Sequence, residues 1–485
     1  MSVASAGISG MASYIPPYRV DLQQWCDWTG DEWSKISSVV GQAFRMRGPN
    51  ENTYTMAATA VMRLIDQYQI DPNQIGYLAL GTESSTDNSA GAVLVRGMLD
   101  DALVAAGRPA IARECEVPEF KHACLGGVYA LKAALRYLQT DGRDKLAIVV
   151  CSDVAEYARG TSGEPTQGAG AVAMLLDGNA SLASIDLTVS GSSSAYRGPD
   201  FRKPLSRFIG QTASQFAQPR DFPVFNGKYS TSCYLDAALT AGRDLFQSVA
   251  GSPAQWLRSL AMIYLHRPYQ RMAENGLAYL YLLALAVDES QVSQDELQQY
   301  AEQAGVDATV LVAELQSTPD LHALVSQGNL GVELFPATAA AARVARKAEV
   351  FAGLLTTRGS DSMQDVGNLY TASLPAWMAA GIEQAHLDNV ELAGQRVLAA
   401  GYGSGDAAEL LVLEFAPQWQ EAAAHLGFAD SLNATVAVSR EDYEALHDGV
   451  AMTGVRRPGV FYIDHVGDGS AQFDDTGIEY YGYQR

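Results

Sequence analysis

The sequence predicts an α/β protein whose central sheets are buried on both faces. Short apolar stretches such as Ile75–Leu80 and Lys145–Val150 are typical of strands that are covered on both sides, and helical patterns alternate with them. A turn of small residues, a helix and two strands occur in this order near residue 124 and again near residue 368. This succession favours α/β architecture in which one supersecondary unit is used twice.

The first part of the chain carries the clearest local patterns. Val3–Tyr18 predicts a short strand and a Pro-Pro turn, and Leu22–Gln42 predicts an acidic helix. A buried strand between two further helices follows, and a polar loop closes that strand. These four elements are predicted at Thr55–Tyr68, Ile75–Leu80, Thr82–Asn88 and Ala90–Ala106.

The stretch Glu119–Leu138 places a cysteine where a helix begins. It turns through small residues at Ala123–Gly127 and continues with apolar residues at helical spacing. Unpaired backbone N–H groups and the positive end of the helix dipole favour a thiolate at Cys124. A free cysteine is more commonly a small buried hydrophobe, so this stretch alone leaves both interpretations open.

The second copy of the pattern lies late in the chain. Gly367–Glu383 predicts a turn that enters a helix, and strands are predicted at Arg396–Ala400 and, after a glycine loop, Leu410–Phe415. Another apolar strand, Ala171–Leu176, completes the first copy. Between the copies, residues 182–229 are predicted to be loop and short strands, and Asp288–Met363 to be a mostly helical insertion.

Composition argues against several classes of partner. The 485 residues are 48% hydrophobic and 18% charged, as in an ordinary globular protein. A net charge of -22 argues against nucleic acid and anionic membranes, because both require a basic face. Five cysteines without a CxxC or CxxH pattern indicate a reducing compartment. We find no signal-peptide pattern and no apolar run of the ~20 residues that span a bilayer, so we expect a soluble cytoplasmic protein.

Four further features could carry chemistry. Glu83 follows a buried strand, where α/β proteins place ligands, although a solvated loop carboxylate is the default for glutamate. His266 in IYLHRPYQRM is either a ligand contact or a hydrogen-bonded core histidine. Asn368 in GNLYTAS is either a ligand contact or a helix cap. The loop Gly403–Gly405 is too short to be a dinucleotide fingerprint.

Taken together, these segments resemble the 3-hydroxy-3-methylglutaryl-CoA synthases of the thiolase superfamily. The resemblance extends from Tyr14 to the C-terminus apart from the insertion, and the matching segments occur in the family's order. They are GTES with Glu83, FKHACLGG with Cys124, CSDVAEYARG with Asp153, EPTQGAGAVAMLL with Thr166, DFRKP with Asp200 and Phe201, NGKYSTSCY with Ser230, LHRPYQRM with His266, GNLYTAS with Asn368, and YGSG with Gly403 and Ser404.

The resemblance implies a catalytic cysteine, glutamate and histidine. Cys124 would carry the acetyl group, Glu83 would take a proton from its methyl group, and His266 would polarise or protonate the ketone of the second substrate. Asn368 would bond the acetoacetyl carbonyl or orient His266, and the other matched residues would bind substrate. Backbone N–H groups at Cys124 and in the Gly403–Gly405 loop would stabilise the thioester oxyanion.

The resemblance also implies an architecture and partners. We expect a thiolase-like layered αβαβα fold with two pseudo-repeated halves. The N-terminal half would be residues 1–181, the C-terminal half residues 182–417, and a tail of residues 418–485 would complete the second half. We also expect a homodimer formed across the central sheets. Acetyl-CoA and acetoacetyl-CoA would be the substrates, without a metal or other cofactor. Arg267 and Arg271 would meet the CoA phosphates. Lys203 is expected to be solvated surface charge, and Leu125 replaces the aromatic residue that usually follows the nucleophile.

Three alternatives stay open at this point. A synthase that adds a β-branch to a polyketide would take acetyl and β-ketoacyl groups from acyl carrier proteins, which would place the enzyme in polyketide rather than isoprenoid (mevalonate) biosynthesis. A thiolase would need a second reactive cysteine late in the chain, and a ketoacyl synthase would use Cys, His and Asn without the glutamate. An inactive thiolase-fold scaffold would not need to retain Cys124, Glu83 and His266.

Overall fold

The structure is a computed structural model that describes residues 6–85, 91–198, 200–201, 222–223, 226–328, 333–450, 452–470, 472 and 474–485. Lys203 and the end of the loop predicted at residues 82–88 lie outside these ranges. None of the helices in the described ranges combines the length and the apolar character that crossing a bilayer requires.

The centre of the molecule is one long sheet built from two corresponding sets of strands. Among the described residues its order is β5-β4-β6-β7-β1-β8-β11-β10-β9. In one set β4 pairs in parallel with β6, and β6, β7 and β1 follow in antiparallel pairs. In the other, β9 pairs in parallel with β10, and β10, β11 and β8 follow in antiparallel pairs. The strands are β1 Gly7–Tyr14, β4 Ile75–Gly81, β5 Glu119–Phe120, β6 Leu146–Ala155, β7 Gly168–Asp177, β8 Ala183–Ser194, β9 Met262–Leu265, β10 Arg396–Gly403 and β11 Ala407–Phe415.

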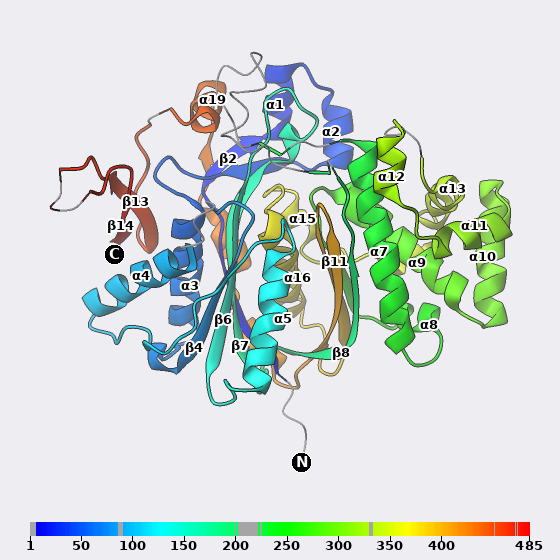
Figure 1. Cartoon of the computed structure of the whole chain (residues 1–485), viewed down its shortest axis with the longest axis horizontal. Helices are drawn as coiled ribbons and strands as arrows, with labels where there is room; N and C mark the ends of the chain where they lie inside the picture. Colours follow the sequence, from blue (N-terminus) through cyan, green and yellow to red (C-terminus); the bar gives the residue numbers. More distant parts are fainter. Residues whose placement is uncertain are drawn as a thin grey trace.

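Helices cover both outer faces of this sheet and fill the space between its two sets of strands (Figure 1). One outer layer lies against the first set, a second outer layer lies against the second set, and a central layer lies between the sets. This arrangement confirms the predicted αβαβα layering with two pseudo-repeated halves. The helices are α3 Thr53–Gln67 and α4 Gly91–Ala105 in the first outer layer, α7 Lys228–Ser248, α8 Pro253–Arg258 and α9 Gln270–Val287 in the second, and α5 Gly126–Gln139 and α16 Ser373–Leu387 in the centre.

The two central helices are buried on nearly all sides, which explains their small residues. α16 has the sequence SLPAWMAAGIEQAHL, and most of its first ten side chains are buried. α5 is more amphipathic, but its Lys132 is also buried and pairs with Glu409 of β11 at 2.6 Å. A buried ion pair of this kind is tolerated because each charge has its partner at hydrogen-bonding distance. It joins the central helix of the first half to a strand of the second.

The remaining elements form the insertion and the terminal segments. The insertion is helical, as predicted, and packs outside α9. A three-stranded sheet of order β12-β2-β3 joins the two ends of the chain, and a two-stranded hairpin of β13 and β14 lies near the C-terminus. These elements are β2 Tyr18–Asp21, α1 Leu22–Thr29, α2 Trp33–Val39, β3 Ala43–Met46, α10 Gln291–Ala304, α11 Ala308–Gln316, α12 Leu321–Ser326, α13 Pro336–Ala345, α14 Glu349–Leu354, α15 Ser360–Met363, α17 Trp419–Ala423, α18 Phe428–Asn433, β12 Val436–Ala437, α19 Arg440–Asp448, β13 Val460–Val466 and β14 Glu479–Gln484, with 3₁₀ turns at Pro72–Gln74, Glu164–Thr166 and Tyr370–Ala372.

Two predictions of local structure were wrong. The helix predicted at Leu22–Gln42 is two helices, α1 and α2, because Gly30 ends the first in a left-handed conformation with φ of 84°. Residues 182–229 were predicted to be loop and short strands, whereas β8 among them is a twelve-residue strand near the middle of the sheet. Its sequence, ASIDLTVSGSSS, is rich in serine, and this composition is typical of loops. Pairing with β1 and β11 on its two sides makes it a strand.

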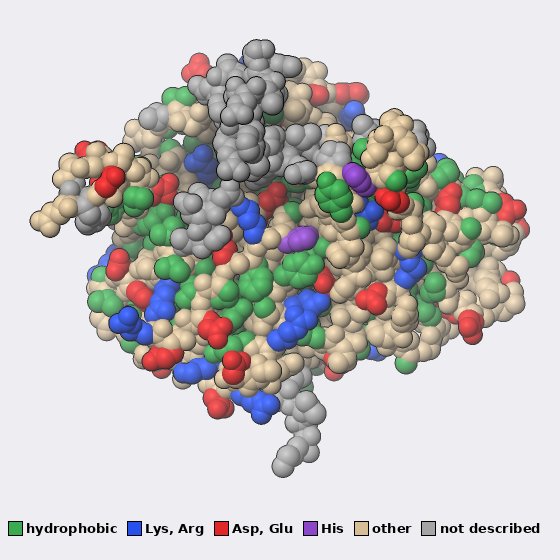
Figure 2. All heavy atoms as spheres, in the orientation of Figure 1, with side chains coloured by type: hydrophobic (Ala, Val, Ile, Leu, Met, Phe, Trp, Pro, Cys, Tyr) green, Lys and Arg blue, Asp and Glu red, His purple; other side chains and the backbone are tan. Residues whose placement is uncertain are grey.

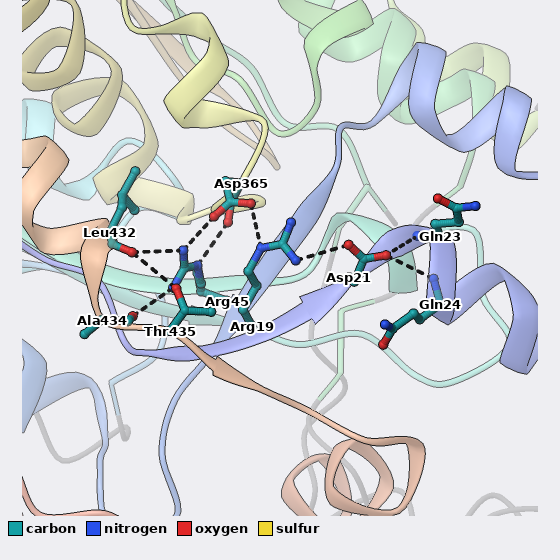
Figure 3. Close-up of polar contacts among 9 residues, drawn as sticks. All are labelled: Arg19, Asp21, Gln23, Gln24, Arg45, Asp365, Leu432, Ala434 and Thr435. Atoms are coloured by element: carbon teal, nitrogen blue, oxygen red, sulfur yellow. Dashed lines mark hydrogen bonds and ion pairs between the residues drawn. The ribbon is translucent and has the colours of Figure 1, made fainter.

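A buried arginine joins three segments that are distant in sequence (Figure 3). Arg45 of β3 is 1% exposed, and its Nη2 pairs with Asp365 Oδ2 at 2.6 Å. Its other N–H groups donate to the backbone oxygen of Asp365 and to those of Leu432 and Ala434. Arg19 of β2 donates to Asp365 Oδ1 at 2.7 Å. The segment just before Asn368 is therefore tied to both terminal regions of the chain.

Candidate active site

Both halves of the molecule contribute to one small pocket. The turn before α5, the end of β9 and the turn before α16 meet there, so the carboxyl ends of strands and the start of helices face the same space. This is the place where open α/β folds put their ligands. The lining residues are Cys124, Tyr157, Ser162, Gly163, Thr166, Phe201, Ser230, His266, Pro268, Tyr269, Met272, Asn368, Tyr402 and Ser404.

Cys124 lies just before the first turn of α5. It is 6% exposed, and Ala123 before it has a φ of 44°, an unusual conformation for a residue other than glycine. α5 begins at Gly126, and the N–H of Gly127 donates to Thr371 Oγ1 at 2.7 Å. The Cys124 Sγ lies 3.7 Å from Glu83 Oε2. A thiol at a helix start with a carboxylate at this distance is placed to lose its proton.

Glu83 reaches Cys124 because a buried aspartate holds its backbone. Asp153 Oδ1 accepts from the N–H groups of Glu83 at 2.7 Å and Ser84 at 2.9 Å, and from Thr82 Oγ1 at 2.9 Å. Its Oδ2 accepts from the Thr371 N–H at 3.0 Å. Asp153 is fully buried, and burial raises its pKa while these hydrogen bonds oppose the rise. It lies beneath the pocket and is not among the lining residues.

His266 follows β9 directly and enters the pocket from the second half. It is 2% exposed, and its backbone N–H donates to Ala400 O at 2.7 Å. Burial lowers the pKa of its imidazole to about 3. The imidazole makes no hydrogen bond with another side chain of the described ranges, and its ring lies 6.4 Å from that of Tyr402. At neutral pH it is a neutral ring with one N–H to donate.

Asn368 is a cap, which is one of the two interpretations that its sequence allows, and it also lines the pocket. Its Oδ1 accepts from the Tyr370 N–H at 2.9 Å and from Ser373 Oγ at 3.0 Å, so it caps the turn that enters α16. Its Nδ2 donates to the Tyr157 hydroxyl at 3.5 Å, at the wall of the pocket. The cap fixes the side chain and leaves its amide nitrogen on the pocket side.

An aromatic wall surrounds Cys124. The rings of Tyr157, Phe201 and Tyr370 are each about 6 Å apart and meet edge to face. Burial raises the pKa of both tyrosines, so their hydroxyls stay neutral. Tyr157 and Tyr370 were not among the predicted site residues. Both stand within matched segments, CSDVAEYARG and GNLYTAS, and could have been found there.

The Gly403–Gly405 loop packs against the turn that carries Cys124. A Cβ on Gly403 would lie 2.6 Å from the backbone oxygen of His122, so only glycine allows this approach. Ser404 lines the pocket. The fully buried Leu125 side chain packs toward Gly401 and Gly403, and it is not among the lining residues. The residue that replaces the usual aromatic is therefore part of the core in this structure.

A buried cluster of charges lies behind Ser404. Arg197 pairs with Asp236 and Asp406, with its Nε 3.0 Å from Asp406 Oδ2. Burial raises the pKa of Asp406 to about 7 and also raises the pKa of Asp200 and Asp236. Asp200 is 1% exposed and is not among the residues that line the pocket, whereas Ser230 and Thr166 are.

The structure does not bring Arg267 and Arg271 to this pocket. Arg271 is a half-exposed side chain that pairs with Glu274 at 2.9 Å, and Arg267 lines a different cavity.

Another set of basic residues lies close to the pocket. Lys35, Arg159 and Arg440 line a groove of about 820 Å³ that shares Ser162 with the Cys124 pocket. On the face drawn in Figure 2, Lys and Arg side chains are scattered among Asp and Glu and do not form one broad basic patch.

The fold is that of a thiolase-like protein. Family models agree: residues 3–181 match hydroxymethylglutaryl-coenzyme A synthase N terminal, and residues 349–448 match hydroxymethylglutaryl-coenzyme A synthase C terminal. A hydroxymethylglutaryl-CoA synthase from Haloferax volcanii is 26% identical over 92% of this chain and 92% of its own length. The chain belongs to the hydroxymethylglutaryl-CoA synthase family.

Solved structures give the same family resemblance. MvaS in complex with 3-hydroxy-3-methylglutaryl coenzyme A is 27% identical, with a TM-score of 0.77 and coverage of 99% of both chains. The curacin biosynthetic pathway HMG synthase in complex with acetyl donor-ACP has a TM-score of 0.69 over 99% of this chain and 100% of its own, at 18% identity. At that identity the second likeness shows the fold alone.

Proposed function

We propose that this protein condenses an acetyl group from acetyl-CoA with acetoacetyl-CoA and releases 3-hydroxy-3-methylglutaryl-CoA and CoA. The observation that carries the proposal is that Cys124 and His266, from the two halves of the fold, line one pocket in a chain of this family. Glu83 is not among the lining residues, but its Oε2 lies 3.7 Å from the Cys124 sulfur. A nucleophile, a base and a hydrogen-bond donor are the three groups that such a condensation requires.

The first step is acetyl transfer to the protein. The Cys124 sulfur attacks the thioester carbon of acetyl-CoA, a new C–S bond forms, and the bond to CoA breaks. The thiol proton of Cys124 ends on the departing CoA thiol. The start of α5 favours the thiolate that this attack needs. Backbone N–H groups beside Cys124 and in the Gly403–Gly405 loop are suited to hold the oxyanion.

The second step forms the carbon–carbon bond. Glu83 removes a proton from the acetyl methyl group, and the resulting enolate carbon attacks the ketone carbon of acetoacetyl-CoA. His266 polarises the ketone oxygen by donating an N–H, because an imidazole with a pKa of about 3 is neutral at working pH. The proton held by Glu83 passes to the new hydroxyl. Water then hydrolyses the thioester to Cys124, which frees the sulfur and leaves a carboxylate on the product.

The groove that shares Ser162 with the pocket is suited to the rest of CoA. Lys35, Arg159 and Arg440 line it, and CoA carries phosphates that need cations against a chain of net charge -22. Arg159 also pairs with Asp448 at 2.8 Å, so a phosphate would compete with that carboxylate. We assign these three residues, rather than Arg267 and Arg271, to the CoA phosphates.

The test compares two donor–acceptor pairs. Purified protein given acetyl-CoA and acetoacetyl-CoA should release free thiol and form 3-hydroxy-3-methylglutaryl-CoA. The alternative, a polyketide β-branching synthase, predicts turnover with acetyl and β-ketoacyl carrier proteins and little with CoA thioesters. Thiol release from neither pair would refute the proposed condensation.

We also propose a cytoplasmic homodimer. All five cysteines are free and buried, which fits a reducing compartment. The sheet ends at the short edge strand β5, and Glu119 of that strand accepts from the Ala92 N–H at the start of α4. Val93 and Leu94 of α4 are exposed at 58% and 37%. Sedimentation equilibrium of Leu94→Glu against the unmodified protein tests this edge as the subunit contact.

A further inference from the structure

A second cavity lies across β9 from the Cys124 pocket. Alternate residues along a strand point to opposite faces. Ile263, Leu265 and Arg267 line this cavity, whereas His266 between them lines the Cys124 pocket. The cavity measures about 360 Å³, within the range of small-molecule sites. Its remaining walls are α9, the segment 355–364 and α16.

Arg267 brings a buried charge to this cavity. It is 4% exposed, its guanidinium lies 5.1 Å from the ring centre of Trp377, and its Nη1 donates to Ser360 Oγ at 2.9 Å. Its Nη2 is buried and has no hydrogen-bond partner among the described residues. Leaving a buried charged donor unpaired is costly, so a ligand acceptor at this nitrogen would be stabilising.

The acidic groups around Arg267 do not supply this acceptor. Glu274 and Asp361 are the carboxylates close enough to act on its pKa, which burial lowers to about 10. Glu274 is engaged by Arg271 at 2.9 Å and by Gln270 Nε2 at 3.0 Å. Asp361 lies exposed on α15. Arg267 remains protonated at neutral pH, and no carboxylate of the described ranges lies within ion-pair distance of it.

The cavity is lined partly by polar side chains, Glu274 and Asp361 among them, and partly by apolar walls. Side chains of β9, α9, residue 355 and α16 provide them, and several hydroxyl and amide groups there are already bonded within the protein. Thr356 Oγ1 accepts from the Ile263 N–H, and Gln384 Oε1 accepts from the Gly359 N–H. The apolar members are Ile263, Leu265, Ala273, Leu277, Leu355 and Trp377. Inorganic phosphate would leave this surface uncovered, whereas a carboxylate on an apolar body would cover it.

We propose that this cavity binds a small monocarboxylate, with its carboxylate on Arg267 and its apolar body between β9 and Trp377. The planar guanidinium matches a carboxylate geometrically, and its Nη2 offers the unused donor. The site is distinct from the Cys124 pocket and does not depend on the proposed condensation. Because Arg267 follows His266 directly, a ligand here sits one residue from the proposed catalytic histidine.

Hexanoate is a suitable probe, and calorimetric titration of the full-length protein measures its binding. We expect one saturable site, at least about tenfold weaker binding for hexanol, which lacks the charge, and a similar loss in Arg267→Gln. Arg343→Gln, which changes an exposed side chain of α13 outside the cavity, should bind hexanoate as the unmodified protein does. Arg267→Lys keeps the charge and should retain part of the affinity.

Hydrogen exchange on the unmodified protein gives a second readout that needs no variant. Hexanoate should slow exchange in residues 263–277 and 355–364. Protection at residues 157–166 instead would place the ligand in the Cys124 pocket and overturn the proposal. Equal binding of hexanol, unchanged binding in a folded Arg267→Gln protein, or tighter binding of inorganic phosphate would overturn it as well.

Discussion

Corresponding strands in the two halves of the sheet are each followed by a polar residue, but the two residues have different surroundings. β4 leads to Glu83 and the corresponding β9 leads to His266. The backbone around Glu83 is held by Asp153 through several short hydrogen bonds. The imidazole of His266 is buried without a side-chain hydrogen bond in the described structure, and its pKa falls to about 3. One strand end therefore positions a carboxylate, and the other keeps an imidazole neutral.

The two central helices show the same contrast. The turn before α5 carries Cys124 and passes through Ala123, with φ of 44°, and the turn before α16 carries Asn368 and passes through Tyr370, with φ of 45°. In both turns a residue other than glycine adopts a positive φ, which costs conformational energy and is frequent at functional sites. Thr371 bonds the Gly127 N–H and Asp153, so the second turn supports the first. The first half presents Cys124, the proposed nucleophile, and the second half supports the turn that carries it.

The largest expected effect is the loss of the nucleophile. Cys124→Ala should lower condensation by about 10⁴-fold or more, because no other group in the pocket can carry the acetyl group. Thiol release and mass spectrometry of the protein incubated with acetyl-CoA measure both the reaction and the acetyl intermediate. Cys115→Ala is the matched control, since Cys115 is equally buried but does not line the pocket. An acetylated Cys124→Ala protein would contradict this assignment.

Variants of Glu83 and His266 should slow the step after acetylation. Glu83→Ala should still form acetyl-Cys124 but lower condensation by about 10²- to 10⁴-fold, the usual contribution of a general base. His266→Gln should also condense slowly, since glutamine places its N–H differently. Single-turnover experiments with labelled acetyl-CoA separate the two steps. Normal condensation by Glu83→Ala would assign the base elsewhere.

The second half's turn should depend on the buried arginine that holds it. Arg45→Met leaves Asp365 without its buried partner and removes three backbone contacts, so we expect a loss of about 3–5 kcal/mol in the free energy of unfolding. Arg19→Met removes a partly exposed partner of the same carboxylate and should cost about 1 kcal/mol. Urea denaturation measures both. Equal losses would show that the burial of Arg45 does not matter.

The low pKa of His266 predicts the shape of a pH profile. Because its imidazole is neutral above about pH 4, kcat/KM should show no histidine titration between pH 5 and 8 that His266→Gln removes. Rates with CoA substrates over this range test it. An inflection near pH 6.5 that disappears in His266→Gln would show that the imidazole is charged in the working protein and acts as a proton donor.

Asp406 should make stability fall as the pH rises. Its folded pKa is about 7 and its ordinary value is 3.8, so between these values the folded protein holds a proton that the unfolded chain has lost. The free energy of unfolding should decrease across this window by up to about 1.4 kcal/mol per pH unit and then level off above pH 7. Asp406→Asn should flatten that dependence. A slope unchanged in Asp406→Asn would assign it to Asp200 or Asp236.

Much of the fold followed from local patterns. Thr53–Gln67, Gly91–Ala105 and Gly126–Gln139 are helices with strong apolar periodicity, and their predicted bounds were close. The region of β8 was predicted to hold loop and only short strands, because its serines carry no apolar signal. Pairing with its two neighbouring strands makes it a long strand of the central sheet. The single helix predicted at Leu22–Gln42 is two helices because one glycine ends the first. The boundaries predicted at residues 181 and 417 and the roles of the individual site residues stay predictions.

The sequence by itself determined the family, because a cysteine at a helix start, GTES, LHRPYQRM, GNLYTAS and YGSG occur in the family's order. It also predicted the residues that carry the chemistry. Only the tertiary structure decided which residues face the same space. His266 and Arg267 are adjacent in sequence just after β9, yet the alternation of side chains continues past the strand's end. One residue lines the Cys124 pocket, and the other lines a separate cavity. The order of motifs along the sequence identifies the family, but the direction in which a side chain points depends on the strand, its register and its neighbours.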